Sequence, residues 1–246
     1  GSDGPGRGAA GVRGGAAGVR RDAAAGDRGQ ARRLTQAPPG IDSLEVRLKA
    51  FFQQREHKPG NVYLGVPHRL DRPVSGAMVF ARHVRAARRL SKQFAARTVR
   101  KVYWALVEGE VTPPEGQWRD FLWKVHGQPR SQVVEPDFPG AQLAVLRYRT
   151  LGRHAHGSWL EIELETGRTH QVRIQAASRG HALLGDAWYG SPLPFGPPSE
   201  DVRERAIALH ARQLEFAHPM TQAPVHIVAP LTVDWHAAGI ETRDVL

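Results

Sequence analysis

The chain has 246 residues, of which 41% are hydrophobic and 24% charged, and it contains no cysteine. This composition suits one packed domain with an extension, and it excludes disulfides, thiolate nucleophiles and cysteine-based zinc sites. The formal net charge of +10 favours an anionic partner, nucleic acid first, although a basic protein without such a partner carries the same charge.

No stretch approaches the ~20 apolar residues of a membrane span, and the first residues lack the apolar core of a secretion signal. We therefore expect a cytoplasmic protein with no membrane partner, and a monomer as the simplest assembly.

Residues 1–33 contain 10 of the 26 glycines, together with eight Ala and seven Arg against three Asp. A segment so poor in larger apolar side chains cannot bury a core, so we predict a disordered extension. It is either a tag remnant or an arm that touches RNA without specificity. Residues 34–246 keep an excess of six positive charges and are predicted to form the single folded domain.

The first predicted elements are a helix and two short strands. Large apolar residues recur at helical spacing after Ser43, a residue type that favours helix N-termini, so a helix is expected to about Gln54. Turn-forming residues at 58–61 follow. The apolar runs Val62–Val66 and Ala77–Ala81 then predict buried strands.

A second helix is predicted after residue 83, with one apolar and one basic face. The apolar face consists of Val84, Ala87, Leu90 and Phe94, and the basic face of Arg85, Arg88, Arg89 and Lys92, with Arg97, Arg100 and Lys101 at the end. Such a basic face is either an ordinary solvated surface or an RNA contact. Its position close to the first motif described below favours RNA.

The later elements are mostly strands. Strands are predicted over Lys101–Glu108, Trp159–Glu165 and Val225–Val228, a helix over Thr169–Arg179, and a surface loop over 191–204. Strict alternation in Trp159–Glu165 indicates a half-exposed strand with one apolar face. The pattern predicts an α+β fold, with a mostly antiparallel mixed sheet and flanking helices, and not a doubly wound one.

The densest chemical signal is the run His68-Arg69-Leu70-Asp71-Arg72-Pro73-Val74-Ser75-Gly76. Proline restricts the backbone and glycine permits a tight turn, so this loop can present Asp71 rigidly. Cations on both sides keep the carboxylate ionised, which suits a nucleophile or base better than a general acid. The same string also describes a surface ion pair, so its spacing alone does not identify a site.

A second signal lies at Glu165–Ile174, where a strand is expected to turn into a helix. Thr169, His170 and Arg173 would share a helical face near the positive helix N-terminus, and Arg168 precedes them, so the segment suits an anion. A structural hydrogen-bond cluster is the alternative for His170 and Gln171.

Together with three further segments, these motifs resemble the signature of the RluA-type pseudouridine synthases. The resemblance covers roughly residues 34–233. The matching runs are His68–Gly76, Lys101–Val107, Gly167–Arg173, Leu184–Gly190, and Leu209–Ala211 with Phe216–Pro219.

This resemblance implies a pseudouridine synthase fold with a central active-site cleft. The implied activity is isomerisation of specific uridines in structured rRNA or tRNA, without metal or other cofactor. Asp71 matches the essential aspartate, which either attacks the sugar C1′ or removes the 2′ proton. Tyr103 matches the tyrosine that packs on the uracil and is a candidate for removing the C5 proton. Arg173 matches the arginine that pairs with the aspartate.

The resemblance and the local charge also suggest residues that bind the RNA. These substrate-binding candidates are Arg69, Arg72, Lys101, Arg168 and His170. Arg69 would fill the space of the displaced base or hold a phosphate. Trp104, next to Tyr103 on the strand, should face the core. His154 and His156 alternate on an expected loop and are predicted to be exposed, so no metal site is expected.

The sequence departs from the family pattern in two places. Pro73 and Val74 stand where relatives often have a threonine before Ser75-Gly76. The family's apolar strand ending in Asn-Lys-Pro-x-Gly is not found before Leu34, so we expect the N-terminal strand to be missing from a truncated or misframed chain. An RNA-binding protein without turnover is therefore a second hypothesis. An Asp-dependent hydrolase, a third, is disfavoured by the basic charge and the lack of a metal-ligand cluster.

Overall fold

The structure is a computed structural model and describes residues 35, 42–57, 60–128, 130–201 and 205–241. Within these residues, one sheet has the strand order β1-β7-β2-β6-β5-β3-β4, with β8 also paired to β7. Only β1 and β7 run parallel. This sheet confirms the predicted α+β fold. The predicted extension at 1–33 lies outside the described residues.

The elements have the following bounds. The strands are β1 (Ser75–Gly76), β2 (Arg100–Glu108), β3 (Glu115–Lys124), β4 (Ser131–Val134), β5 (Gln142–His154), β6 (Gly157–Leu164), β7 (Leu209–Ala217) and β8 (Pro224–Val228). The helices are α1 (Leu44–Glu56), α2 (Val84–Ala95), α3 (Gln171–Ala177) and α4 (Val233–Ala237), with a short 3₁₀ turn, η2 (Ala187–Tyr189). None of these described helices is long and apolar enough to cross a membrane.

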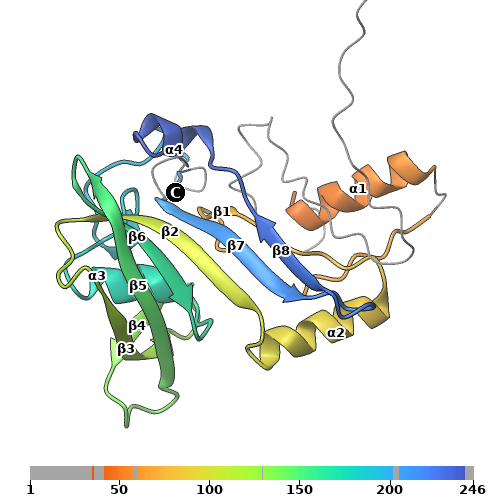
Figure 1. Ribbon diagram of the computed structural model, residues 1–246, viewed down its shortest axis with the longest axis horizontal. Helices are drawn as coiled ribbons and strands as arrows, with labels where there is room; N and C mark the ends of the chain where they lie inside the picture. The colour runs from red at the N-terminus through yellow and green to blue at the C-terminus, as the bar shows by residue number, and fades with distance from the viewer. Residues whose placement is uncertain (1–34, 36–41, 58–59, 129, 202–204, 242–246) are drawn as a thin grey trace, which may run out of the picture.

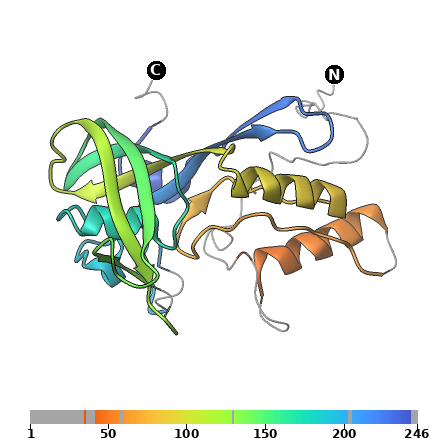
Figure 2. The ribbon, with the colours of Figure 1, turned by 90° about the horizontal axis from the view of Figure 1, so that it is seen from below.

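The sheet carries helices at both ends of the molecule. Figures 1 and 2 show α1 and α2 at the end opposite to β3, β4 and β5. Helix α2 buries Ala86 and Leu90 against Leu214 and Phe216 of β7. Helix α3 packs on the other end of the sheet, where Val172 and Ala176 share a buried core with Leu146, Leu160 and Ile162. This burial fixes α3 on the face of β2 that also carries Tyr103.

Helices α1 and α2 agree with the sequence in place but not in every buried position. The Ser43 hydroxyl accepts a hydrogen bond from the Val46 amide at 3.3 Å and caps α1 as predicted. In α2 the predicted core residue Val84 is 51% exposed, and Ala86 is buried in its place. Val84 is the first residue of the helix, where its side chain lies beyond the packed turns.

The two strands predicted before α2 are wrong as strands. Val62–Val66 and Ala77–Ala81 meet in one isolated bridge, between Gly65 and Ala81. Most of their apolar side chains are nevertheless buried or half-buried, with Val79 and Ala81 packed in the core under α2, although Tyr63 is 44% exposed. The apolar runs therefore indicate burial, but the two segments form no ladder of backbone hydrogen bonds with each other.

The strands predicted at 101–108, 159–165 and 225–228 are present as β2, β6 and β8. Trp104 is buried against Trp159, as expected for the face opposite Tyr103. His156 is exposed, but His154 ends β5 and is half-buried, with Nε2 3.2 Å from the Val107 carbonyl oxygen. The predicted loop at 191–204 has no helix or strand over its described residues 191–201.

Candidate active site

A short parallel strand pairing holds the Asp71 loop against the sheet. The Val74 amide donates to the Asp71 carbonyl at 3.0 Å, which closes a turn, and β1 then runs beside β7. Gly76 has φ +124°, and a Cβ there would lie 2.4 Å from the Ala211 carbonyl oxygen. Glycine is therefore required for the close approach that anchors this loop.

Ser75 and His210 join the same loop to β7 through their side chains. The Ser75 hydroxyl lies 2.8 Å from Nδ1 of His210, and Nε2 of His210 lies 3.4 Å from the Ala229 carbonyl. Because a carbonyl only accepts, Nε2 carries the proton and Nδ1 accepts from Ser75. Burial lowers the pKa of His210 to about 4, against an ordinary value of 6.5.

Buried His210 should make the protein sensitive to acid. The unfolded chain takes up its proton near pH 6.5 and the folded one only near pH 4, so the free energy of unfolding falls as pH drops through this window. Across this window, the shifted pKa of His210 lowers the free energy of unfolding by about 3 kcal/mol. We expect His210→Gln to reduce the pH slope seen in urea unfolding between these values, whereas His156→Gln on the surface should not. An unchanged slope in His210→Gln would contradict this assignment.

Helix α3 begins later than predicted, at Gln171 and not at Thr169. His170 adopts a left-handed conformation with φ 54°, which interrupts the helix. The buried Gln171 amide oxygen accepts from the Arg168 amide at 3.0 Å and from the Thr166 hydroxyl at 2.7 Å. These bonds fix the turn that carries Arg168 and His170, so Gln171 is structural, as the alternative interpretation proposed.

Asp71 faces two cationic or polar groups from α3 and its first turn. Its Oδ2 lies 3.6 Å from Nε2 of His170 and 3.7 Å from Nη1 of Arg173. The Asp71 side chain keeps 26% of its surface exposed. The carboxylate is therefore held by charge, at distances longer than hydrogen bonds, and remains accessible to a substrate.

Tyr103 also lies close to Asp71. It lies on β2, partly buried against the same core as α3. Burial raises the pKa of the Tyr103 phenol, and the charge of Asp71 raises it further. The phenol is therefore neutral at pH 7 and close enough to Asp71 to sense its charge.

The principal partner of Arg173 is Asp186, which sequence reasoning missed. The Arg173 Nε and Nη2 atoms donate to the two Asp186 carboxylate oxygens at 2.6 and 2.8 Å. The side chains are 5% and 1% exposed, respectively. Burial alone would lower the pKa of Arg173, but the hydrogen bonds to Asp186 raise it. Asp186 was visible in the Leu184–Gly190 run, but only the fold reveals its partner.

Tyr189 supports His170 from behind. The Tyr189 hydroxyl lies 3.0 Å from Nδ1 of His170 and accepts from the Ser131 amide at 3.0 Å. If that hydroxyl donates to Nδ1, the imidazole proton sits on Nε2 and points towards Asp71. Burial lowers the pKa of His170, against the opposing charge of Asp71, so the ring is neutral at pH 7.

The remaining predicted residues fall into two groups. Arg69 is exposed on the Asp71 loop, near enough for its charge to lower the pKa of His170, and Arg72 is half-buried on that loop. Lys101 and Arg168 form a separate group: a Cβ on Gly167 would lie 3.6 Å from the Lys101 ammonium. A hollow of about 240 Å³ adjoins Arg168 and Thr169, and Asp71 is not among the residues that line it.

The described residues contain no group of three or more His, Asp or Glu side chains that could hold a metal ion. The Asp71 carboxylate lies near a buried arginine and a neutral histidine, with a neutral phenol close enough to sense its charge. Such a carboxylate can attack an electrophilic carbon or remove a proton.

Comparisons with known proteins identify the family of this chain. The sequence model of a family described as RNA pseudouridylate synthase matches residues 33–178. A Synechocystis protein named an uncharacterized RNA pseudouridine synthase is 36% identical over 68% of this chain and 50% of its own length. The Pseudomonas aeruginosa ribosomal large subunit pseudouridine synthase D is 34% identical over 70% of this chain and 54% of its own. The chain thus spans about half the length of the curated relatives it matches.

A solved structure shares the fold. The human RNA pseudouridylate synthase domain containing 4 superposes with a TM-score of 0.67, covering 86% of this chain and 88% of that one, at 22% sequence identity. At this level of identity the similarity establishes the shared fold.

Proposed function

Because this chain belongs to the RNA pseudouridylate synthase family, of the RluA type, we propose that it isomerises specific uridines in structured RNA to pseudouridine. In this reaction the bond between uracil N1 and sugar C1′ breaks, the uracil turns, and C5 bonds to C1′. The C5 hydrogen leaves as a proton and N1 gains one, so the reaction is redox-neutral and needs no co-reactant.

The observation that carries the proposal is the placement of Asp71 beside His170, Arg173 and Tyr103. Asp71 acts as nucleophile on C1′ or as base on the 2′ proton, and both routes need an ionised, accessible carboxylate. Arg173 orients it with its positive charge. The neutral His170 ring lies 3.6 Å from the same oxygen, which limits the charge that must be desolvated when RNA covers the site.

Tyr103 is better suited to packing than to proton transfer. A general base works best with a pKa near the operating pH, whereas burial and Asp71 raise the pKa of this phenol. We therefore propose that Tyr103 packs on the target uracil as it turns. The C5 proton then leaves to another acceptor. Asp71 is a candidate, because its carboxylate is close enough to Tyr103 to affect the phenol.

The RNA target is rRNA or tRNA, and rRNA is favoured. Relatives from several bacteria are named for the ribosomal large subunit, and the net charge of +10 suits an RNA backbone. The target base must leave its stack, at a cost of a few kcal/mol, and exposed Arg69 is positioned to occupy the space it vacates. We also propose that the enzyme is a monomer and acts in the cytoplasm, as expected from the sequence.

Release of tritium from RNA labelled at uridine C5 tests this function, because only loss of the C5 hydrogen frees the label. The substrate is deproteinised RNA from cells that lack the gene, labelled with 5-tritiated uridine. We expect release at a limited number of sites, which carbodiimide primer extension then maps. Binding of this RNA without any release would instead support the RNA-binding hypothesis.

A further inference from the structure

Three cations cluster beside the candidate active site: Arg97, Lys101 and Arg168. The Lys101 ammonium lies next to Gly167, which directly precedes Arg168. Besides burial, the positive charge of Arg97 lowers the pKa of both Lys101 and Arg168, so Arg97 lies within interaction range of each of them. Like charges held together cost free energy unless an anion joins them.

Acidic partners are available nearby but serve other residues. Arg100, one residue before Lys101 on the opposite face of β2, pairs with Glu163 and Glu215. Arg147 of β5 pairs with Glu165. Within the described part of the chain, none of the three clustered cations has an ion pair, and the Arg168 Nε donates to the Leu143 carbonyl at 2.9 Å. Glu163, Glu215 and Glu165 thus neutralise arginines of the opposite face and not the three clustered cations.

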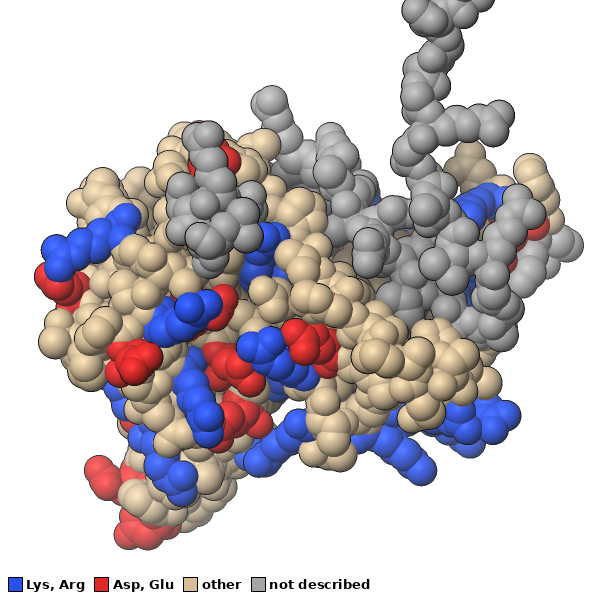
Figure 3. Space-filling model, viewed as in Figure 1, with Lys and Arg blue, Asp and Glu red and all other residues tan. Residues whose placement is uncertain are grey.

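The cluster adjoins the catalytic group through two short connections. Lys101 lies two residues before Tyr103 on the same face of β2, and Arg168 lies two residues before His170. Arg97 takes a left-handed conformation, φ 58°, just after α2. The positive surface continues along α2, whose edge carries blue side chains with no red ones beside them in Figure 3.

We propose that Arg97, Lys101 and Arg168 bind a backbone phosphodiester of the RNA, next to the target uridine. This inference rests on the proposed function and assigns its backbone contact. Arginine and lysine side chains that lack carboxylate partners match the two charged oxygens of a phosphodiester. The hollow of about 240 Å³ that Arg168 also lines offers space for the adjoining nucleoside. A phosphate here would anchor the strand while the uridine turns over Asp71.

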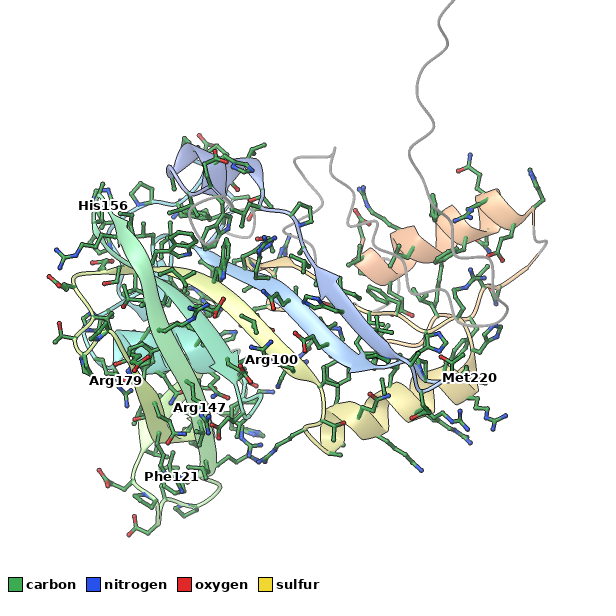
Figure 4. The ribbon with its side chains drawn as sticks, in the orientation of Figure 1. Arg100, Phe121, Arg147, His156, Arg179 and Met220 are labelled. Atoms are coloured by element: carbon green, nitrogen blue, oxygen red, sulfur yellow. The ribbon has the colours of Figure 1, made fainter. Side chains whose placement is uncertain are left out.

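The test measures binding of deproteinised ribosomal RNA at several KCl concentrations by filter retention. Asp71→Asn protein is used throughout, so that no turnover intervenes. Replacing all three cations by glutamine should weaken binding at least tenfold at low salt. It should also reduce the slope of log affinity against log salt by about 0.7 to 0.9, the value for one phosphate contact. Arg147→Gln, which removes a paired arginine from the opposite face, should leave both unchanged (Figure 4).

Stability of the same variants separates binding from a structural role. If the cluster serves RNA, Lys101→Gln relieves repulsion and should not lower the thermal midpoint of the free protein. An unchanged salt slope in the triple variant, or an equal loss in Arg147→Gln, would overturn the phosphate site. A failed tritium assay would overturn the isomerase but leave this binding test intact.

Discussion

Replacing Asp71 by asparagine is expected to abolish tritium release, by more than about a thousandfold, while RNA affinity stays within a few-fold of the parent. Asparagine has nearly the same shape and keeps an oxygen or amide group facing Nε2 of His170 and Nη1 of Arg173. It cannot attack C1′ or hold a proton from the sugar. Both chemical routes therefore fail together, although the pocket is preserved.

A matched control comes from the exposed carboxylate of Asp137, which lies in the loop between β4 and β5. Asp137→Asn removes the same charge and should leave the release rate unchanged. Asp71→Asn with turnover within tenfold of the parent would exclude Asp71 as the reacting carboxylate. A joint loss of RNA binding and turnover would indicate instead that the loop had unfolded, which urea unfolding detects.

The sequence predicts the strands whose apolar alternation is clear, and it misses those whose alternation is masked by charge. In β6, Leu160 and Ile162 alternate with glutamates and the strand is recognisable. In β5, Arg147 and Arg149 alternate with buried Leu146 and Tyr148, but no strand is predicted from this pattern. The missing signal is the partner: Glu165 and Glu161 neutralise these arginines only once the strands lie side by side.

The site shows the same division between local and long-range information. Motif residues such as Asp71 and Arg173 were identifiable because their neighbours in sequence resemble a known family. The pairing of Arg173 with Asp186, and the approach of Arg97 to Lys101, depend on left-handed turns at His170 and Arg97. Neither residue is a glycine, so the residue type at these positions does not predict a left-handed turn. Contacts created by such turns become visible only in the fold.

The Arg173–Asp186 pair yields the largest stability prediction. Asp186→Leu removes the closer ion-pair partner of the buried Arg173 side chain. The Asp71 carboxylate then lies 3.7 Å from it. Removing one partner of a buried pair costs about 3 to 5 kcal/mol. We expect a decrease of this size in the free energy of unfolding measured in urea. The partly exposed pair of Asp120 and Arg179 provides the control, because Asp120→Leu should cost less.

A double replacement then separates folding from catalysis. Arg173→Met with Asp186→Leu removes both charges and fills the space with apolar side chains, which often restores stability lost by either change alone. We expect near-parental unfolding but little tritium release, because no guanidinium then faces Asp71. If the double variant regains release within tenfold of the parent, Arg173 serves only the fold. If it regains stability alone, the role of the pair is to hold the Arg173 charge beside the reacting carboxylate, and Asp186 compensates that charge in its buried position.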